Sequence, residues 1–478
     1  MGDLKSYLYS LTSKRVAVAG AGISNTPLIN LLLDAGMDIT ICDKRSRSEL
    51  GESVVINYEK NGAKLRLGEN YLAGLNEDVI FRTPGLMPSN PALSQAVSKG
   101  AALTSEMEVF FDLCPCKIIA VTGSDGKTTT TSIIAKLLEN DGKTVHLGGN
   151  IGTPLLNKTD EIKPDDIAVV ELSSFQLITM HKSPDIAVVT NLSPNHLDIH
   201  SDLNEYIDAK SNIFMYQKQS DRVVFNLDND VTRNYAQDAP AGEVLFFSRN
   251  NKVENGVYCR DGMIYESRDN VDTEIMRSDD ILLPGVHNIE NYLAAFAAVS
   301  GIVSYDSMRK TAKTFTGVEH RIELVRELNG VKYYNDSIAS SPSRAIAALK
   351  AFTEKEDSFI PKNRRHMILI AGGKDKGIEF DELGTEINAR VKVLVLTGAA
   401  KNQIHDAVVS AVNHCSSDAG KALEIFMFDD FEDAVQTASG LAVSGDIVLL
   451  SPACTSFDRF KNFEERGKLY KDIVNRLV

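Results

Sequence analysis

Residues 117–138 read KIIAVTGSDGKTTTTSIIAKLL and decide how the middle of the chain folds. The opening KIIAVT is mostly apolar, as in a buried strand, and glycines follow it directly. Apolar residues then recur at helical spacing on one face: Ile133, Ile134, Leu137 and Leu138. A strand, a glycine turn and a helix that begins with Lys-Thr form an anion site, because free backbone N–H groups and the helix dipole point at phosphate oxygens. The stretch therefore predicts a phosphate-binding loop.

The polar residues of this loop indicate a magnesium nucleotide as its ligand. Lys127 adds a mobile positive charge, and Thr128 offers a hydroxyl to a magnesium ion that bridges phosphate oxygens. The glycines are separated by two residues, whereas the common P-loop has four between them. We expect ATP to be bound by this run of residues: Gly123, Ser124, Asp125, Gly126, Lys127, Thr128 and Thr129. No pattern in the sequence explains the negative charge that Asp125 places near the triphosphate.

The composition is that of an acidic, multidomain globular protein. The chain has 478 residues, of which 43% are hydrophobic and 24% charged. A prior of about one domain per 150 residues predicts about three domains. The 51 basic and 65 acidic residues leave a net charge of -14, so the field of the protein repels nucleic acid and anionic membrane surfaces. We therefore expect no nucleic-acid partner.

Targeting signals are not recognisable in the sequence. The first residues, MGDLKSYLYSLTSKR, lack the apolar core of a signal peptide, and no later stretch has about 18 uninterrupted apolar residues. The six cysteines have no CxxC spacing, unlike those of a disulfide scaffold or a zinc ribbon. Cys114-Pro115-Cys116 is interpreted as part of a linker. These features predict a cytoplasmic protein without membrane insertion.

Apolar runs that end in small residues predict an α/β protein built on mostly parallel sheets. Near the start, VAVAGAG (16–22), a helix-spaced stretch and ITICD (39–43) form a predicted βαβ unit. In the middle, strands are predicted from IAVVEL (167–172), IAVVTNL (186–192) and RVVFNL (222–227). In the last third, strands are predicted from MILIAGG (367–373), VKVLVLTGA (391–399) and DIVLLSPA (446–453), interleaved with helices as in doubly wound folds.

Two side chains just past predicted strands are candidates to hold the metal ion together with Thr128. Glu171 ends the IAVVEL strand, and a buried carboxylate there can bind magnesium. His196, in NLSPNHLD, can coordinate a metal or hold a phosphate. His196 and His200 have the spacing of a metalloprotease pair, but Leu197 stands where that motif has its catalytic glutamate. A metalloprotease is therefore not predicted.

Five motifs together resemble the Mur ligase family, and the resemblance covers nearly the whole chain. They are TGSDGKTT (122–129), ELSSFQL (171–177), NLSPNHLD (191–198), HNIEN (287–291) and HR (320–321). The segment LSPACTSFDRFKNFEERG (450–467), with SNTPL (24–28), is similar to the family member that joins D-glutamate to UDP-N-acetylmuramoyl-L-alanine. The resemblance implies three domains: a Rossmann-like UDP-sugar-binding domain over 1–105, a central P-loop ATPase-like domain over 106–317, and a Rossmann-like amino-acid-binding domain over 318–478.

The resemblance also implies the residues of each site. UDP-sugar binding is expected of Ile23, Ser24, Asp43, Lys44, Arg45, Thr83, Gly85 and Asn150. ATP contacts beyond the loop are expected of Asn291, Arg321 and Asp336, and D-glutamate contacts of Lys376, Ser456 and Phe463. Lys210 resembles a lysine that carbon dioxide carbamylates in the family, and the implied catalytic residues are Lys127, Glu171, His196 and Lys210.

The chain departs from its expected patterns at three positions. Asn25 stands where a dinucleotide fingerprint has its third glycine, which argues against a nicotinamide cofactor. Ile338 stands where some relatives carry a lysine, so that contact is either absent or supplied elsewhere, with Lys374 and Arg344 as the candidates. Asp125 stands where many relatives have asparagine.

The expected activity is ATP- and magnesium-dependent ligation. The carboxylate of UDP-N-acetylmuramoyl-L-alanine is expected to become an acyl phosphate, which the amine of D-glutamate then attacks. We expect a monomer whose carboxyl-terminal domain closes on its ligands. Three alternatives remain open: another Mur-type or folylpolyglutamate-type amide ligase, a P-loop switch or assembly ATPase, and a dinucleotide-binding oxidoreductase or sensor.

Overall fold

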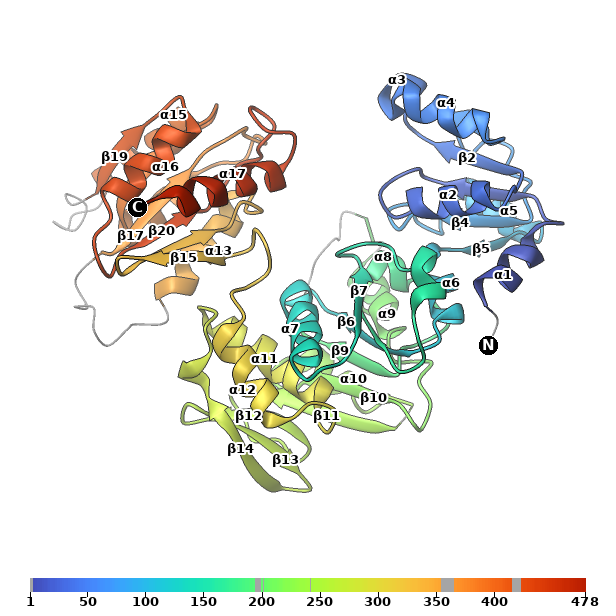
Figure 1. The fold of residues 1–478 in the computed structure, drawn as a ribbon, viewed down its shortest axis with the longest axis horizontal. Helices are drawn as coiled ribbons and strands as arrows, with labels where there is room; N and C mark the ends of the chain where they lie inside the picture. The colour runs from blue at the N-terminus through green and yellow to red at the C-terminus, as the bar shows by residue number, and fades with distance from the viewer. Residues whose placement is uncertain (1–2, 194–198, 201, 241, 354–364, 415–422) are drawn as a thin grey trace. The chain divides into compact units, whose positions relative to one another are not determined.

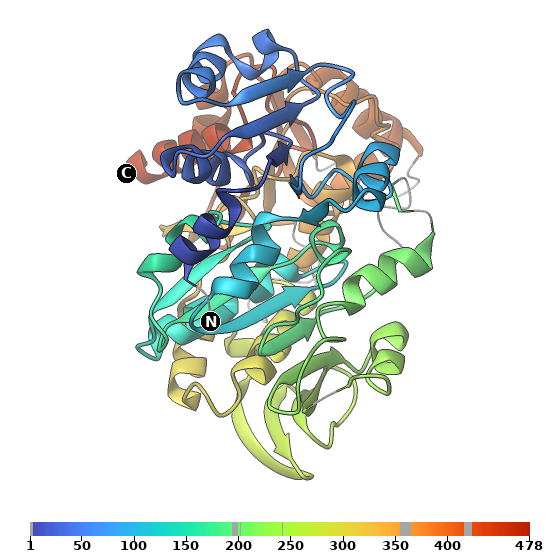
Figure 2. The same cartoon turned by 90° about the vertical axis from the view of Figure 1, so that its right-hand side faces the viewer.

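The computed structural model describes residues 3–193, 199–200, 202–240, 242–353, 365–414 and 423–478. These residues form two compact units, whose elements are shown in Figure 1 and, from the side, in Figure 2. The first unit holds residues 1–280 and 290–311, and the second holds residues 281–289 and 312–478. Over the described ranges, none of the helices is both long and apolar enough to cross a membrane.

The amino-terminal part of the first unit is a parallel sheet with the strand order β3-β2-β1-β4-β5. Its strands are β1 (Val16–Ala19), β2 (Ile39–Asp43), β3 (Lys64–Leu67), β4 (Val79–Arg82) and β5 (Ala102–Thr104). Its helices are α1 (Leu4–Leu11), α2 (Thr26–Asp34), α3 (Arg47–Leu50), α4 (Glu52–Lys60), α5 (Pro91–Ser98) and α6 (Glu106–Leu113). The predicted βαβ unit is confirmed as β1-α2-β2. The strand order reverses between β1 and β4, and a ligand crevice is expected at their carboxyl ends.

The rest of the first unit is built on a larger sheet with the order β14-β13-β12-β11-β10-β9-β6-β8-β7. Its strands are β6 (Lys117–Thr122), β7 (Val145–Gly149), β8 (Ile167–Glu171), β9 (Ile186–Val189), β10 (Arg222–Asn226), β11 (Glu243–Ser248), β12 (Gly256–Arg260), β13 (Met263–Arg268) and β14 (Val271–Arg277). The sheet is parallel from β7 to β12, as predicted, and β13 and β14 extend one edge as antiparallel strands (Figure 1).

Helices connect these strands and follow the phosphate loop. They are α7 (Lys127–Asn140), α8 (Ser174–Leu177), α9 (Leu203–Ser211) and α10 (Asp230–Tyr235), with short 3-10 turns η1 (Leu156–Glu161) and η2 (Ser278–Asp280). Helices α11 (Val286–Val299) and α12 (Tyr305–Thr314) come after the last strand, and the division between the two units falls within both of them. Strand β6 lies in the interior of the sheet between β8 and β9. The loop after β6 is therefore flanked by the carboxyl ends of two parallel strands, where site residues can converge.

The second unit contains the sheet β15-β16-β20-β17-β18-β19, in which β15 alone is antiparallel to its neighbour among the described strands. Its strands are β15 (Glu323–Leu328), β16 (Val331–Asn335), β17 (Met367–Ala371), β18 (Val391–Leu396), β19 (Glu424–Met427) and β20 (Ile447–Leu450). Its helices are α13 (Pro342–Thr353), α14 (Asp381–Arg390), α15 (Lys401–His414), α16 (Phe431–Gly440) and α17 (Phe463–Arg476). The doubly wound arrangement predicted for this part of the chain is confirmed.

Continuous apolar strands suit this sheet because helices cover both of its faces. In β17, Leu369 lies in one buried cluster with Leu349 of α13, and Ile370 lies in a second cluster with Val435 of α16 and Val474 of α17. Because helices cover both faces, a ligand can reach this sheet at the ends of its strands. The predicted domain boundaries after residues 105 and 317 stay predictions, since the two compact units divide the chain at other positions.

Candidate active site

The phosphate loop after β6 has backbone angles that only glycine adopts readily at two positions. Gly123 has a φ of 148° and Gly126 a φ of 78°. A Cβ atom at Gly123 would overlap Thr190 Oγ1, and one at Gly126 would overlap Asn291 Oδ1. The glycines therefore allow both the loop conformation and the close approach of these two side chains.

Side chains from the segment that follows β9 and from α9 hold the loop in this conformation, and the sequence patterns did not predict their role. Asn191 Oδ1 accepts the backbone N–H of Asp125 at 2.9 Å, and Thr190 Oγ1 donates to the carbonyl of Asp125 at 2.6 Å. Ser124 Oγ lies 2.9 Å from the hydroxyl of Tyr206, to which it is hydrogen-bonded. The side chain of Asp125 itself is exposed, and its negative charge acts on Tyr206 and Lys210.

Two lysines contact the carbonyl groups of the loop. Lys127 Nζ donates to the carbonyls of Gly123 and Ser124 at 2.9 and 2.8 Å. Lys210 Nζ donates to the Gly123 carbonyl at 2.9 Å and is 2% exposed. Burial, and secondly the charge of Lys127, hold the pKa of Lys210 well below its ordinary value. A neutral amine, which carbamylation by carbon dioxide requires, is therefore favoured at this position.

A buried carboxylate lies beside the first helical turn after the loop. Glu171, at the end of β8, is 1% exposed. Its Oε2 accepts the hydroxyl of Thr128 at 2.7 Å, and its Oε1 accepts the amide N–H of Asn150 at 2.7 Å. The structure thus brings together two predicted metal ligands, Thr128 and Glu171, with a predicted UDP-sugar contact, Asn150. The third predicted metal ligand, His196, lies outside the described residues.

Two further polar side chains of the first unit are buried near the loop. Asn291, in α11, accepts the hydroxyl of Thr130 at 3.2 Å and is 6% exposed. This residue was predicted to contact ATP, and it lies against the loop at Gly126. His200 was rejected as a metalloprotease ligand, and it is instead hydrogen-bonded to Ser174 at 3.0 Å and stacked on Phe175.

The predicted UDP-sugar residues of the first sheet gather where its strand order reverses. Asp43 ends β2, and its carboxylate accepts N–H groups of Arg45 and the backbone N–H of Ala21 at 2.7 to 2.9 Å. Burial would raise the pKa of Asp43, but the hydrogen bonds from Arg45 and Ala21 outweigh burial and hold that pKa below its usual range. Lys44 and Ile23 are exposed, and Ser24 is half-buried. Asp43 therefore fixes the glycine turn and orients the Arg45 guanidinium.

The turn after β4 packs against the turn after β1. Gly20 has a φ of 97°, and a Cβ atom there would meet Thr83 Cγ2 at 2.7 Å. Asn25 replaces the third fingerprint glycine and donates from Nδ2 to the Gly20 carbonyl at 2.9 Å. Thr83 and Gly85 thus belong to one turn, and this turn packs against the turn that contains Gly20. Asn25 braces the turn from within.

In the second unit, Asp336 ends up buried beside the segment that contains Arg321. Its carboxylate accepts the hydroxyl of Ser451 at 2.8 Å and the backbone N–H of Ile322 at 3.3 Å. Burial raises the pKa of Asp336 to about 7, against the opposing effect of these hydrogen bonds. Two residues of this segment, His320 and Ile322, have positive φ angles of 64° and 45°. Such strained backbone is often found at functional sites.

The predicted amino-acid-binding residues come from loops that are paired by backbone hydrogen bonds. Lys374 and Thr455 exchange N–H···O bonds of 2.8 and 3.0 Å. This pairing sets the loop with Lys376 beside the loop with Ser456. Phe463, at the start of α17, accepts the hydroxyl of Ser337 at its carbonyl at 2.8 Å.

Arg344 and Lys374 were both predicted as substitutes for the lysine missing at Ile338. Arg344 Nη1 donates to the carbonyl of Ile338 at 3.3 Å, so its positive charge lies next to that position. Lys374 is exposed, and its backbone is used in the loop pairing. Arg344 therefore lies beside that position, and its role as the substitute stays a prediction.

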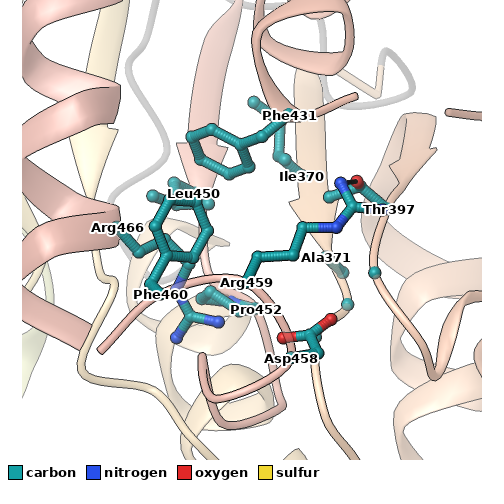
Figure 3. A pocket seen from close by; sticks show the side chains of 13 residues that line it. Ile370, Ala371, Thr397, Phe431, Leu450, Pro452, Asp458, Arg459, Phe460 and Arg466 are labelled. Atoms are coloured by element: carbon teal, nitrogen blue, oxygen red, sulfur yellow. Dashed lines mark hydrogen bonds between the residues drawn. The ribbon is translucent and has the colours of Figure 1, made fainter. Parts of the chain in front are cut away.

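A small pocket opens at the carboxyl ends of β17, β18 and β20 (Figure 3). It is lined by Ile370, Ala371, Gly372, Gly373, Thr397, Gly398, Phe431, Leu450, Pro452, Asp458, Arg459, Phe460 and Arg466. Arg466 is 2% exposed and donates to the carbonyls of Ser337 and Cys454 at 2.8 and 3.2 Å. The pocket neighbours the predicted amino-acid residues, but none of Lys376, Ser456 and Phe463 is among the described residues that line it.

Two family models match most of the chain. Residues 121–299 match the Mur ligase middle domain, and residues 320–454 match the Mur ligase glutamate ligase domain. The chain therefore belongs to the Mur ligase family. It is similar to the UDP-N-acetylmuramoylalanine--D-glutamate ligase of Ruminiclostridium cellulolyticum, with 49% identity over 99% of both chains. It is equally similar to the enzyme of that name from Acetivibrio thermocellus, with 50% identity over 99% of both.

Solved structures of lower sequence identity share the fold. The UDP-N-acetylmuramate-alanine ligase of Thermotoga maritima has a TM-score of 0.55 and 16% identity, over 97% of this chain and 99% of that one. A UDP-N-acetylmuramoyl-L-alanyl-D-glutamate--2,6-diaminopimelate ligase has a TM-score of 0.55 and 18% identity, over 92% and 93%. The α/β architecture read from the sequence is thus that of this family.

Proposed function

We propose that the chain joins D-glutamate to UDP-N-acetylmuramoyl-L-alanine at the expense of ATP. The choice of substrates is supported by full-length relatives of about half-identical sequence that carry this activity in their names. The observation that carries the proposal is the arrangement of Lys127, Thr128 and Glu171 around a glycine loop. Such an arrangement binds the phosphates of ATP and leaves the γ-phosphate open to a second substrate.

In the first step, an oxygen of the substrate carboxylate attacks the γ-phosphorus of ATP. The bond between that phosphorus and the β,γ-bridging oxygen breaks, which gives an acyl phosphate and ADP. Lys127 is the flexible cation beside the transferred group, and the free N–H groups in the first turn of α7 would face the phosphate oxygens. The protein contributes by positioning the reactants and neutralising charge.

The donor set at Glu171 fits magnesium. Thr128 Oγ1 and Glu171 Oε2 are hard oxygen ligands and lie 2.7 Å apart. The described residues contain no cluster of three or more His, Cys, Asp or Glu side chains that could hold a metal on their own. Magnesium suits such a site because it usually shares its coordination with phosphates and water. When bound, it supplies positive charge to the phosphate oxygens.

In the second step, the neutral amine of D-glutamate attacks the carbonyl carbon of the acyl phosphate. The tetrahedral intermediate expels phosphate, the amine loses a proton to water, and the new amide remains. No protein nucleophile is needed. We propose that Lys376 pairs with a carboxylate of D-glutamate, with Ser456, Phe463 and the guanidinium of Arg344 completing the amino-acid site.

The proposed function is tested by omitting or exchanging one amine at a time. Purified protein with ATP, magnesium and UDP-N-acetylmuramoyl-L-alanine receives D-glutamate, L-glutamate, L-alanine or no amine, and phosphate and amide are measured together. We expect equal amounts of phosphate and amide with D-glutamate alone. Steady phosphate release without an amine would indicate a P-loop ATPase, and an amide with another amino acid would indicate a different amide ligase.

The substitution Asp125→Asn tests the unexplained charge near the triphosphate. Because the Asp125 side chain is exposed, its repulsion of ATP is weakened by water. We expect KM for ATP to fall about twofold to threefold, with kcat unchanged and the difference fading at high salt. Steady-state kinetics at low and high ionic strength measure this. A large fall in kcat would instead give Asp125 a part in the chemistry.

The remaining expectations concern the state of the protein in the cell. We propose that it acts as a monomer in the cytoplasm, where its nucleotide substrates are found. Light scattering on the purified protein, with and without substrates, measures its mass and so tests the proposed monomer.

A further inference from the structure

A buried arginine lies where the first sheet of the first unit meets the larger one. Arg82 is the last residue of β4 and has no exposed surface. Its Nη2 donates to the carbonyl of Phe175 at 2.7 Å and to the hydroxyl of Thr179 at 2.8 Å. Its Nη1 donates to the carbonyls of Pro84 and Leu86 at 3.3 and 3.4 Å. One guanidinium therefore joins two segments that are distant in the sequence.

The segment on the Nη1 side is the turn after β4. It contains Thr83 and Gly85, which are proposed to contact the UDP-sugar, and it packs on the turn that follows β1. Arg82 holds two carbonyls of this turn, those of Pro84 and Leu86, from a buried position. It therefore restrains the backbone of the turn that carries Thr83 and Gly85.

The segment on the Nη2 side is α8 and the turn that follows it. Helix α8 begins at Ser174, three residues after the proposed metal ligand Glu171. Ser173 caps the helix by accepting the backbone N–H of Gln176, and Ser174 is hydrogen-bonded to His200. This segment is thus continuous with the end of β8, beside the phosphate loop.

The charge of Arg82 has no close acidic partner among the described residues. Its Nε makes no hydrogen bond, and Glu108, the acidic group that acts on its pKa, is not within ion-pair distance. A buried, unpaired guanidinium is costly compared with an apolar side chain of similar size. The planar guanidinium has one geometric advantage over an apolar side chain, because it can donate hydrogen bonds to carbonyl groups of both segments at once.

We propose that Arg82 is a positioning residue for acyl-phosphate formation. It fixes the UDP-sugar turn relative to the end of β8, so that the substrate carboxylate reaches the γ-phosphate in line. This inference rests on the proposed function and names a residue for which the sequence analysis predicted no role. Arg82 itself is fully buried and its donors are used by the two segments, so its loss should affect reaction rate more than binding.

The test compares R82M, which keeps the side-chain length without the donors, with R82K, which keeps a cation. We expect kcat of R82M to fall about fiftyfold, because a displacement of about 1 Å between reactants costs on the order of a hundredfold in rate. The dissociation constants of ATP and of UDP-N-acetylmuramoyl-L-alanine, measured separately by calorimetry, should stay within about twofold. R82K should recover part of kcat, since an ammonium can hold one of the two segments.

A single-turnover measurement locates the defect. With D-glutamate omitted, the first ADP formed per enzyme reports acyl-phosphate formation, and this rate should fall as far as kcat. The matched control is R66M, because Arg66 lies in the same sheet, pairs with Glu77 and is outside the proposed sites. R66M should form ADP at the wild-type rate. Should R82M not fold, R82K decides the matter through the same split between kcat and affinity.

The inference is overturned if R82M keeps the wild-type kcat, if it loses affinity for either ligand more than tenfold, or if R82K is as slow as R82M. The wild-type chain, assayed in parallel, separates the inference from the proposed function. No amide from the wild type contradicts the proposed function and, with it, the inference. Wild-type turnover together with an unimpaired R82M contradicts the inference alone.

Discussion

Replacing Lys210 with alanine is expected to lower kcat about a thousandfold, with partial recovery when acetate or another short carboxylate is added. The side chain is buried against the Gly123 carbonyl of the phosphate loop, and its lowered pKa favours the neutral amine. A neutral amine can add to carbon dioxide, releasing one proton and leaving a carbamate. The proposed carbamate would place a negative charge near the nucleotide's magnesium, and a small carboxylate can occupy the space that alanine opens.

Carbon dioxide and pH should control the same step in the wild type. The neutral amine becomes more abundant as pH rises through the pKa of Lys210, and a lowered pKa moves that rise towards neutral pH. Activity should therefore fall in carbon-dioxide-depleted buffer and return with bicarbonate. The control is Lys218→Ala, since Lys218 is an exposed lysine of the same unit. Unchanged turnover in Lys210→Ala would remove the residue from the mechanism, and acceleration of Lys218→Ala by the added carboxylate would show a nonspecific salt effect.

The sheets could be predicted because their strands are apolar runs that stop at glycine or at a small residue. In β6 and β17 the run and its following glycines are continuous in sequence, so periodicity alone locates the strand end and the loop. The phosphate loop could be predicted for the same reason, since strand, glycines, Lys127 and helix occur in order. Local signals of this kind need no knowledge of the fold.

The supports of the loop could not be predicted, because they come from distant parts of the chain. Thr190 and Asn191 are more than sixty residues away from Asp125, and Tyr206 is more than eighty residues away from Ser124. A threonine or tyrosine at those positions has no sequence pattern that distinguishes it from a core residue. The contact exists because β9 is a direct neighbour of β6 in the sheet.

For single residues, the contacts in the structure add to or differ from the roles that the family resemblance implied. Asn150 was expected at the UDP-sugar, and the structure shows its amide on Glu171, which makes it a link between the two proposed sites. Asn25 was noted only as a departure from a glycine pattern, and it proves to brace the Gly20 turn. The sequence predicted no role for Arg82. A lone arginine at the end of an apolar strand has no pattern that distinguishes a buried arginine from one in a surface ion pair.

The substitution Glu171→Gln should separate activity from stability. Glutamine keeps the size of the side chain and can still accept the hydroxyl of Thr128, but it removes the negative charge proposed to hold magnesium. We expect kcat/KM for ATP to fall by roughly a hundredfold to a thousandfold. Part of the lost rate should return as magnesium is raised, because the weakened site fills again by mass action.

The melting temperature of the same variant should stay equal or rise. Glu171 is 1% exposed, and among the described residues its hydrogen-bond partners are a hydroxyl and an amide, so its charge is buried without full compensation. Removing such a charge removes the free-energy cost of burying it, a cost that is retained in the wild type because the charge is needed for activity. The matched control is Glu139→Gln on the exposed side of α7, which should leave kinetics and magnesium dependence unchanged. If Glu171→Gln loses activity only in proportion to a fall in stability, the carboxylate supports the fold, and the proposed metal site must be sought elsewhere.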